Sequence, residues 1–186
     1  MSIARLDHER ALLMVIDLQE KLLPGIPDAE RLLRRVEVLI RAFRILGIPI
    51  LVTEQNPERL GATNPKILEA VGEGTAPIGK LTFGCLACEE VAEAAYATER
   101  DQLILCGIET HVCILQTALQ GMDEEWDVFL AVDAIASRRP ADHETALRRL
   151  EQAGAVPASV EMLIMEALSR AGTEQFKAIL PLVKEL

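Results

Sequence analysis

Short apolar runs alternate along the chain with segments in which apolar residues recur at helical spacing. The apolar runs predict buried strands at 12–17, 48–54, 101–107 and 126–134, a weak strand at 75–79 and a short strand near Val156. The helical spacing predicts helices at 28–46, 65–70, 87–99, 111–120, 140–152, 159–169 and 173–184. Strands and helices therefore alternate from one end of the sequence to the other.

The ends of these elements carry residues that commonly start or stop them. Asp28 suits the N-cap of the first predicted helix, and Gly47 suits its end. Gly121 is expected to end the helix that begins near residue 111. The Pro, Gly and Asn content of residues 55–65 predicts a loop.

Strands that are apolar throughout are buried on both faces, which is typical of a parallel sheet with helices on each side. The right-handed crossover rule then gives a three-layer α/β/α sandwich of Rossmann-like type. A length of 186 residues suits one domain, so residues 1–186 are expected to form a single domain. Ligands of such sheets bind beyond the carboxyl ends of the strands, where we look for reactive residues.

Composition narrows the class of partner to a small molecule. A net charge of −10 repels nucleic acid and anionic membranes, and an aromatic content of 3% leaves little for base stacking. No apolar stretch approaches the ~20 residues of a membrane span. The N-terminal sequence lacks a secretory pattern, so we expect a cytoplasmic protein whose four cysteines are reduced thiols.

Three reactive residues fall at or near predicted strand ends. Asp17 ends the first strand, where it either accepts backbone N–H groups of the next turn or acts as a general base. Cys113 falls in the first turn of a helix, whose unpaired N–H groups lower the pKa of a thiol. Taken alone, Cys113 is better interpreted as a small core residue, as is Cys106 within its apolar strand. Lys80 alone is a surface residue, but an ammonium directed at Cys113 would stabilise a thiolate and an oxyanion.

The remaining cysteines and the histidines give weaker signals. Cys85 and Cys88 have a CxxC spacing but lie mid-chain, without the second pair of a zinc ribbon, so packing is expected. The three histidines are scattered without metal-ligand spacing. His111 lies two residues before Cys113, a spacing that directs side chains apart at the start of a helix.

Four blocks of the chain, in order and spacing, resemble the isochorismatase-like superfamily of cysteine hydrolases. They are LLMVIDLQ at 12–19, GKLTFG at 79–84, LILCGIETHVCILQTAL at 103–119 and VDAIASR at 132–138. The resemblance extends from about residue 10 to residue 168, and GIETHVC is its most specific piece.

This resemblance implies a six-stranded parallel sheet and a role for each reactive residue. Asp17 is implied to be the catalytic base, Lys80 the catalytic lysine, and Cys113 the nucleophile that forms a covalent acyl or thioester intermediate. A cis peptide between Ile108 and Glu109 is also implied. It would turn the N–H groups of Glu109 and Cys113 into an oxyanion hole.

Two departures from better-defined members narrow the substrate. Nicotinamidases of this superfamily bind a metal through an Asp-x-His pair and further histidines, whereas the matching stretch TEQNPERLGATNP has no histidine. Isochorismatases proper lack the cysteine and cleave a vinyl ether, whereas this chain has Cys113. The chain looks most like isochorismatase-domain hydrolases of undefined substrate, with no metal or other cofactor.

The combined expectation is a cysteine-dependent hydrolase that cleaves a C–N bond of amide type in a small molecule. Gln19, Glu54 and Phe83 are candidates for substrate contact. One alternative is a catalytically silent binding or scaffold member of the same fold. Another is thiol redox chemistry through Cys85 and Cys88 or Cys113.

The last predicted helix also bears on assembly. An apolar stripe recurs on it at helical spacing, formed by Phe176, Ile179, Leu180 and Val183. The stripe is expected to be buried either on its own chain or on a second subunit of a homo-oligomer, which is common among the relatives.

Overall fold

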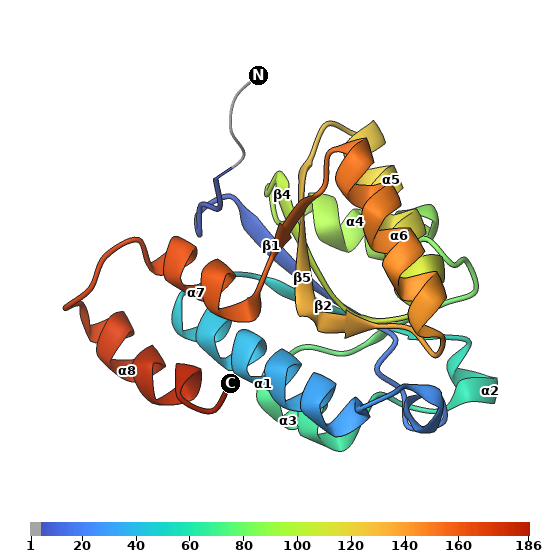
Figure 1. Cartoon of the computed structure of the whole chain (residues 1–186), viewed down its shortest axis with the longest axis horizontal. Coiled ribbons are helices and arrows are strands. Elements are labelled where there is room, and N and C mark those ends of the chain that lie inside the picture. The colour runs from blue at the N-terminus through green and yellow to red at the C-terminus, as the bar shows by residue number, and fades with distance from the viewer. Residues whose placement is uncertain (1–4) are drawn as a thin grey trace.

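The computed structural model describes residues 5–186. Its sheet has six strands, all parallel, in the order β3-β2-β1-β4-β5-β6 (Figure 1). The strands are β1 (Ala11–Ile16), β2 (Ile50–Gln55), β3 (Ile78–Lys80), β4 (Gln102–Ile108), β5 (Asp127–Ala136) and β6 (Val156–Ala158). The helices are α1 (Ala29–Ile45), α2 (Pro57–Leu60), α3 (Pro65–Val71), α4 (Glu89–Tyr96), α5 (Leu115–Asp123), α6 (Pro140–Ala153), α7 (Val160–Leu168) and α8 (Glu174–Val183).

Helices cover both faces of this sheet, so the expected three-layer α/β/α sandwich with a six-stranded parallel sheet is confirmed. Helices α1, α3, α7 and α8 lie on one face, and α4, α5 and α6 lie on the other (Figure 1). All six residues of β1 are buried. Leu13 and Val15 pack into the first layer and Leu12, Met14 and Ile16 into the second, because successive side chains of a strand point to opposite faces.

The apolar stripe of α8 packs on its own chain. Ile179 is fully buried, and Phe176 and Val183 pack against the same core, beside α1 (Figure 1). This packing accounts for three of the four stripe residues without a second subunit. Homo-oligomer formation therefore stays a prediction.

The expected end of α5 at Gly121 is wrong. The helix continues to Asp123, and Gly121 is buried against the sheet. A Cβ atom there would lie 3.1 Å from the Leu103 side chain and 3.2 Å from the Val128 side chain. The glycine allows close packing between helix and sheet, a role that its sequence position alone does not reveal.

Three other boundaries differ in detail. Asp28 precedes α1 as expected, but its side chain makes no capping hydrogen bond, and its backbone is left-handed. The predicted loop at 55–65 contains the short helix α2, which begins at a proline. Strand β3 lies at Ile78–Lys80 rather than 75–79, so Lys80 is part of the strand and pairs with Gln55 of β2.

Within the described part of the chain, no helix combines the length and the apolarity that crossing a membrane requires.

Candidate active site

Strand order reverses between β1 and β4. From β1 the chain proceeds through β2 to β3 on one side, then returns to β4 on the other side of β1. The carboxyl ends of β1 and β4 therefore flank the crevice where ligands of such sheets bind. At Gly107, which has a φ of 120°, the two backbones are so close that a Cβ atom would lie 2.1 Å from the Ile16 carbonyl oxygen.

Asp17 and Lys80 form a buried ion pair at this crevice. Asp17 follows β1 with a φ of 57°, a left-handed conformation that Asp tolerates better than most residues. Its Oδ2 lies 2.9 Å from Lys80 Nζ, and its Oδ1 accepts a hydrogen bond of 2.9 Å from Thr53 Oγ1. The side chains of Lys80 and Asp17 are 0% and 2% exposed. Both carboxylate oxygens bind side chains, so the alternative role in capping the next turn is not what the structure shows.

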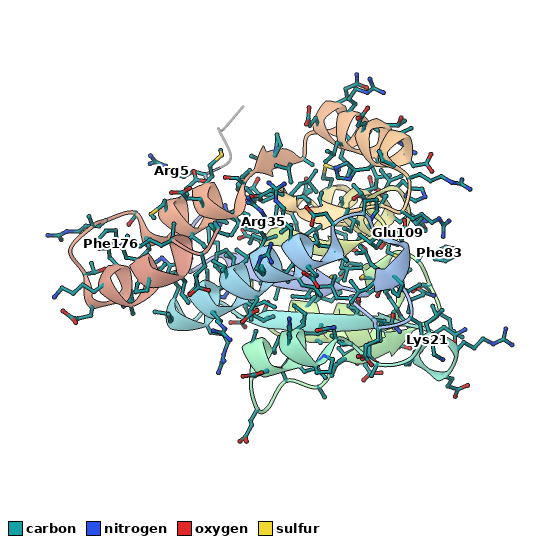
Figure 2. All side chains as sticks on the ribbon, turned by 60° about the horizontal axis from the view of Figure 1, so that its bottom comes forward. Arg5, Lys21, Arg35, Phe83, Glu109 and Phe176 are labelled. Atoms are coloured by element: carbon teal, nitrogen blue, oxygen red, sulfur yellow. The ribbon has the colours of Figure 1, made fainter. Side chains whose placement is uncertain are left out.

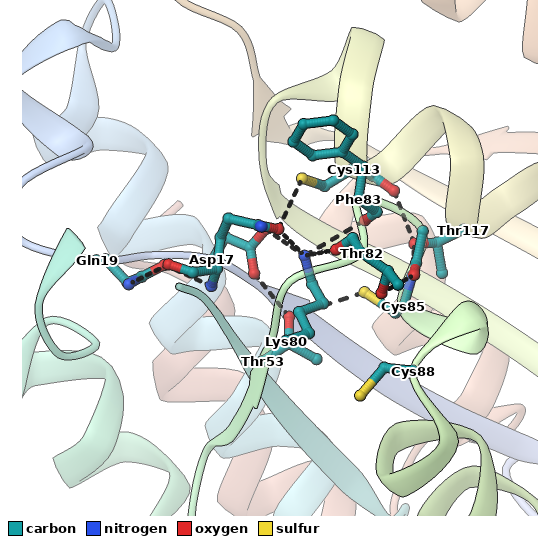
Figure 3. Close-up of polar contacts among 12 residues, drawn as sticks. Asp17, Gln19, Thr53, Lys80, Thr82, Phe83, Cys85, Cys88, Cys113 and Thr117 are labelled. Atoms are coloured by element: carbon teal, nitrogen blue, oxygen red, sulfur yellow. Dashed lines mark hydrogen bonds and ion pairs between the residues drawn. The ribbon is translucent and has the colours of Figure 1, made fainter. Parts of the chain in front are cut away.

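The Lys80 ammonium is surrounded by oxygen atoms. Besides Asp17, it donates to Gln55 Oε1 at 2.7 Å and contacts the carbonyl oxygens of Thr82 and Phe83, each at 3.3 Å (Figure 3). An ammonium has three hydrogens to donate, so these four acceptors occupy it fully.

Charge keeps Lys80 protonated in spite of its burial. Burial by itself lowers the pKa of Lys80, and the negative charge of Asp17 is the largest of the effects that raise it. The pKa of Lys80 consequently lies above its ordinary value. The site therefore contains a permanent cation at neutral pH.

Cys113 lies in a one-turn π-helix, Thr110–Ile114, that joins β4 to α5, and it is 5% exposed. Its Sγ is 4.0 Å from Gln55 Oε1, and the Asp17 carboxylate faces it as a negative charge and a hydrogen-bond acceptor. Burial first, and then Asp17, raise the pKa of the Cys113 thiol above its ordinary value, against the opposing charge of Lys80. The expected lowering by a helix N-terminus is thus wrong, because lost hydration outweighs it, and the thiol is protonated at rest.

The expected cis peptide between Ile108 and Glu109 is also wrong. Residues 5–186 contain no cis peptide bond. Glu109 instead adopts a left-handed conformation with a φ of 44°, and its carbonyl accepts hydrogen bonds from Val112 N at 2.9 Å and Ile114 N at 3.3 Å. The oxyanion-binding role of the Glu109 and Cys113 N–H groups stays a prediction.

Gln19 is fully buried and binds the backbone of Gln55. Its Oε1 accepts from Gln55 N at 2.8 Å, and its Nε2 donates to Gln55 O at 3.1 Å and to Gly61 O at 2.6 Å. Both ends of the amide are therefore engaged within the protein. Gln19 fixes the end of β2, and its predicted substrate contact has no support from these bonds.

Glu54 and Phe83 differ in whether their side chains are free to contact a ligand. Glu54 is buried, and its Oε1 accepts from Thr63 N at 2.6 Å and Thr63 Oγ1 at 2.7 Å, so it anchors a loop. Phe83 is 52% exposed and stands at the same end of the molecule as Glu109 (Figure 2). Of the three predicted substrate contacts, Phe83 alone has a side chain open to a ligand.

Gln55 is a polar residue of the site that the sequence analysis does not identify as a candidate. Its Oε1 lies between Lys80 Nζ and Cys113 Sγ, and its Nε2 donates to Leu81 O at 3.0 Å. The sequence pattern places it in the loop that follows the second strand, whereas it is the last residue of β2. Its position at the carboxyl end of a strand beside β1 is the signal that identifies it.

Cys85 also lies at the site, as a structural link. Its Sγ is 3.8 Å from Thr53 Oγ1, and burial raises the pKa of its thiol to about 11. Its N–H donates to Thr117 Oγ1 at 2.9 Å, which donates in turn to the Cys113 carbonyl at 2.7 Å. These bonds tie the segment after β3 to the turn that carries Cys113.

His111 turns away from Cys113, as its spacing predicts. Its Nδ1 is 3.0 Å from Ser137 Oγ and 3.2 Å from Glu109 Oε2, and its Nε2 is 3.8 Å from Asp142 Oδ2. It supports the turn from the side and lies outside the Asp17, Lys80 and Cys113 group.

One surface hollow shares residues with the site. It has a volume of about 270 Å³ and is lined by residues 56–58 and 79–81, which include Lys80. A different hollow of about 930 Å³ is lined by residues 5–10, Asp127 and part of 165–169, and neither Asp17, Lys80 nor Cys113 lines it.

Known proteins resemble this chain over nearly its whole length. A family model described as "Isochorismatase domain" matches residues 11–162. Isochorismatase domain-containing protein 2A of Mus musculus is 36% identical over 184 residues, which cover 99% of this chain and 87% of the mouse protein.

Two solved structures share the fold closely. The structure of MAR1 ribonuclease from Caenorhabditis elegans has a TM-score of 0.92 and 34% sequence identity, covering 97% of this chain and 93% of that one. YcaC from Pseudomonas aeruginosa, solved with hexane-2,5-diol and covalent acrylamide, has a TM-score of 0.90 and 25% identity, covering 98% and 93%.

Proposed function

This chain belongs to the isochorismatase domain family, and from that premise we propose that it is a cysteine-dependent hydrolase of small amides. Family membership supports a hydrolase. The finer proposal rests on one observation, the buried Asp17–Lys80 pair that faces the Cys113 thiol at the carboxyl ends of β1 and β4.

Asp17 is the proposed general base. Because burial keeps the Cys113 thiol protonated, attack requires that Asp17 accept its proton. The S–H bond breaks as Sγ bonds to the carbonyl carbon of the substrate, and the carbonyl π electrons become an oxyanion. Lys80 remains protonated and offsets the negative charge that this step creates in the crevice.

The N–H groups of Glu109 and Cys113 are the proposed donors to the oxyanion. Loss of one such donor lowers kcat by about 100- to 1,000-fold in well-characterised hydrolases. When the C–N bond breaks, the amine leaves with the proton held by Asp17. Water then adds to the thioester, Asp17 relays one of its protons to the departing sulfur, and the carboxylic acid is released with the thiol restored.

Two considerations from relatives bear on this proposal. YcaC carries covalent acrylamide, which is itself a small amide and adds to nucleophiles such as thiols. The stretch that holds metal-binding histidines in nicotinamidases has none here. Both support a metal-free thiol chemistry on small amides.

Acrylamide labelling followed by intact-mass measurement tests the nucleophile. Sγ bonds to the terminal alkene carbon and the thiol proton moves to the neighbouring carbon, so the chain gains the mass of one acrylamide. We expect a single rapid adduct that Cys113→Ser abolishes and Cys88→Ser, at a half-buried cysteine, retains. Lys80→Met should slow labelling by about tenfold or more, because the lysine charge favours the thiolate.

Lys21→Met is the matched control for the lysine, because the Lys21 side chain is exposed and donates only to the Arg59 carbonyl at 2.9 Å. An amide library then tests turnover. If Cys113 reacts no faster than the thiol of N-acetylcysteine, the chain is the catalytically silent binding member that the fold also permits. A labelling rate that is indifferent to Lys80→Met would contradict the proposed role of that residue.

RNA cleavage is a second candidate because of the name carried by the relative from Caenorhabditis elegans. The net charge of −10 opposes it, since RNA binding requires cations to neutralise phosphates. Incubation with a labelled RNA, using the Cys113→Ser protein as a blank, decides between the two. We expect no cleavage above the blank.

We also propose that the protein is cytoplasmic and that it forms a homo-oligomer. All four cysteines are free thiols, which suits the reducing cytoplasm. Sedimentation velocity tests the proposed homo-oligomer, and a single monomeric species at micromolar concentration would reject it.

A further inference from the structure

Two large apolar side chains are exposed on the segment that surrounds the Lys80 ammonium. Leu81 is 76% exposed and Phe83 is 52% exposed. The backbone of this segment is fixed at the site, because Lys80 Nζ binds the Thr82 and Phe83 carbonyls and Gln55 Nε2 binds the Leu81 carbonyl. The backbone therefore faces the reactive centre while the Leu81 and Phe83 side chains remain uncovered.

The figures place the Phe83 ring on the Cys113 side of Lys80. Its ring stands at the end of the molecule where Glu109 also lies (Figure 2), and in the close-up it projects on the same side of Lys80 as the Cys113 sulfur (Figure 3). Burying a large apolar side chain is favourable, and a ligand that covers these two would gain that contribution.

The reactive centre has no net charge before a substrate enters. The charges of Asp17 and Lys80 cancel, and Cys113 keeps its proton. The ammonium of Lys80 already meets four oxygen acceptors with three hydrogens. A carboxylate or phosphate group that entered the site would therefore find no free N–H group of Lys80 to bind.

Two cations of neighbouring loops have partners within the protein. Lys21 donates to the Arg59 carbonyl, and Arg138 lies 3.8 Å from Glu109 Oε1. Desolvating an anion without a partner is strongly unfavourable. The net charge of −10 on the whole chain acts in the same direction.

We propose that the substrate is an uncharged amide with an apolar substituent, and that Leu81 and Phe83 cover this substituent as specificity-determining residues. This inference rests on the proposed amide hydrolysis at Cys113. It adds the chemical class of the group that lies beside the reacting bond.

Four acrylamides test the substrate class: acrylamide, uncharged N-butylacrylamide, anionic N-acryloylglycine and cationic N-(2-aminoethyl)acrylamide. The rate at which each forms the Cys113 adduct is measured by intact mass and divided by its rate with N-acetylcysteine. We expect the butyl compound to exceed acrylamide by about tenfold, as partial burial of four carbons implies. Both Asp17 oxygens are already bound, so a cation also finds no free partner at the site, and both charged compounds should react no faster than acrylamide.

Leu81→Ser and Phe83→Ala test the residues. In each variant the ratio of the butyl rate to the acrylamide rate should fall towards one. Met162→Ala is the matched control, because Met162 of α7 is 57% exposed and lies outside the proposed site. Its ratio should equal that of the unchanged protein. Sedimentation velocity is recorded for all three variants.

Several results would overturn the inference. One is a ratio that Leu81→Ser and Phe83→Ala leave unchanged, and another is faster reaction of a charged compound. Dissociation of an oligomer by either variant, with the ratio retained, would assign the two side chains to a second copy of the chain. If acrylamide labels Cys113 rapidly without a butyl preference, only the substrate class fails. If Cys113 is not labelled at all, the proposed function fails, and this inference with it.

Discussion

The carboxylate of Asp17 is held in the protein interior by side chains from two other strands. Lys80 of β3 supplies the opposite charge, and Thr53 of β2 supplies a hydroxyl hydrogen. A buried charge without its partner destabilises a protein by about 3–5 kcal/mol, so these contacts stabilise the fold as well as the site. They also fix which carboxylate oxygen faces which partner.

Thr53→Val is predicted to weaken both the fold and the nucleophile. The substitution keeps the shape of the side chain but removes the donor to Asp17 Oδ1. A hydrogen bond to a charged group contributes about 1.5–3 kcal/mol, and we expect a loss of that size in the free energy of unfolding measured in urea. Labelling of Cys113 by acrylamide should slow in parallel, because Asp17 is no longer held in place.

Thr53→Ser is the control, since it retains the hydroxyl. Equal stability and equal labelling rates in the Val and Ser variants would show that the hydroxyl does not hold Asp17.

Stability is predicted to fall in alkaline solution because of buried thiols. Burial raises the pKa of Cys85 to about 11 from the ordinary thiol value of 9.0, and burial likewise raises the pKa values of Cys106 and Cys113. In the folded state these thiols keep their protons at a pH where the unfolded chain releases them. Their contribution is therefore fully present below about pH 9 and is lost as the pH rises through the folded values.

Urea unfolding at about pH 7.5, 9 and 10.5 measures this loss. Cys85→Ala should show a smaller decline in the free energy of unfolding than the unchanged protein, because one buried thiol is gone. Cys88→Ser, at a cysteine that is not fully buried, should decline as the unchanged protein does. A flat profile for the unchanged protein contradicts the prediction.

At the scale of elements, strands β1 and β4 position the site by their close approach. Gly107 has a φ of 120°, and a Cβ atom there would lie 2.1 Å from Ile16 O and 2.7 Å from Ile16 N. Both obstacles are backbone atoms in the central strand, which cannot rotate aside. The glycine thus allows the turn with Cys113 to start directly beside the end of β1.

Gly107→Ala is predicted to abolish folding or to lower the free energy of unfolding by more than about 4 kcal/mol. Left-handed strain and a backbone clash act together at this position. Urea unfolding and the yield of soluble protein measure the effect. Gly25→Ala is the control, because a Cβ atom at Gly25 meets nothing within 4 Å, and it should change stability by less than about 1 kcal/mol. Similar losses of stability in Gly107→Ala and Gly25→Ala would contradict the close approach of β1 and β4.

Element boundaries were predictable where they follow from local pattern. The strand predicted at 101–107 lies at Gln102–Ile108, and the helix predicted at 140–152 lies at Pro140–Ala153. Boundaries set by packing were not. Gly121 is such a case, since its contact with the Leu103 and Val128 side chains keeps it inside α5.

At the scale of the whole molecule, the described residues do not bring potential metal ligands together in a cluster. Among residues 5–186, no three His, Cys, Asp or Glu side chains converge as a metal site would require. The proposed chemistry uses Asp17, Lys80 and Cys113 alone.

Turnover of an amide is therefore predicted to survive chelation. Treatment with EDTA followed by removal of the chelator should leave kcat and KM equal, within experimental error, to those of the untreated protein. Loss of activity that zinc restores would contradict the proposed site.

Local pattern determined the alternation of strands and helices, the parallel three-layer fold and the positions of Asp17, Lys80 and Cys113 near strand ends. These follow because burial on both faces of a strand and helical periodicity are properties of short stretches of chain. The resemblance to a family supplied their roles, which sequence position alone left open between chemistry and packing.

Tertiary structure decided what depends on distances across the chain. It brought Gln55 and Cys85 to the reactive centre, engaged Gln19 and Glu54 in internal hydrogen bonds, and left Phe83 exposed. It also reversed the direction of the expected change in the pKa of the Cys113 thiol. Hydration and Coulomb energies depend on which groups surround an atom in space, and segments far apart in the sequence supply those groups.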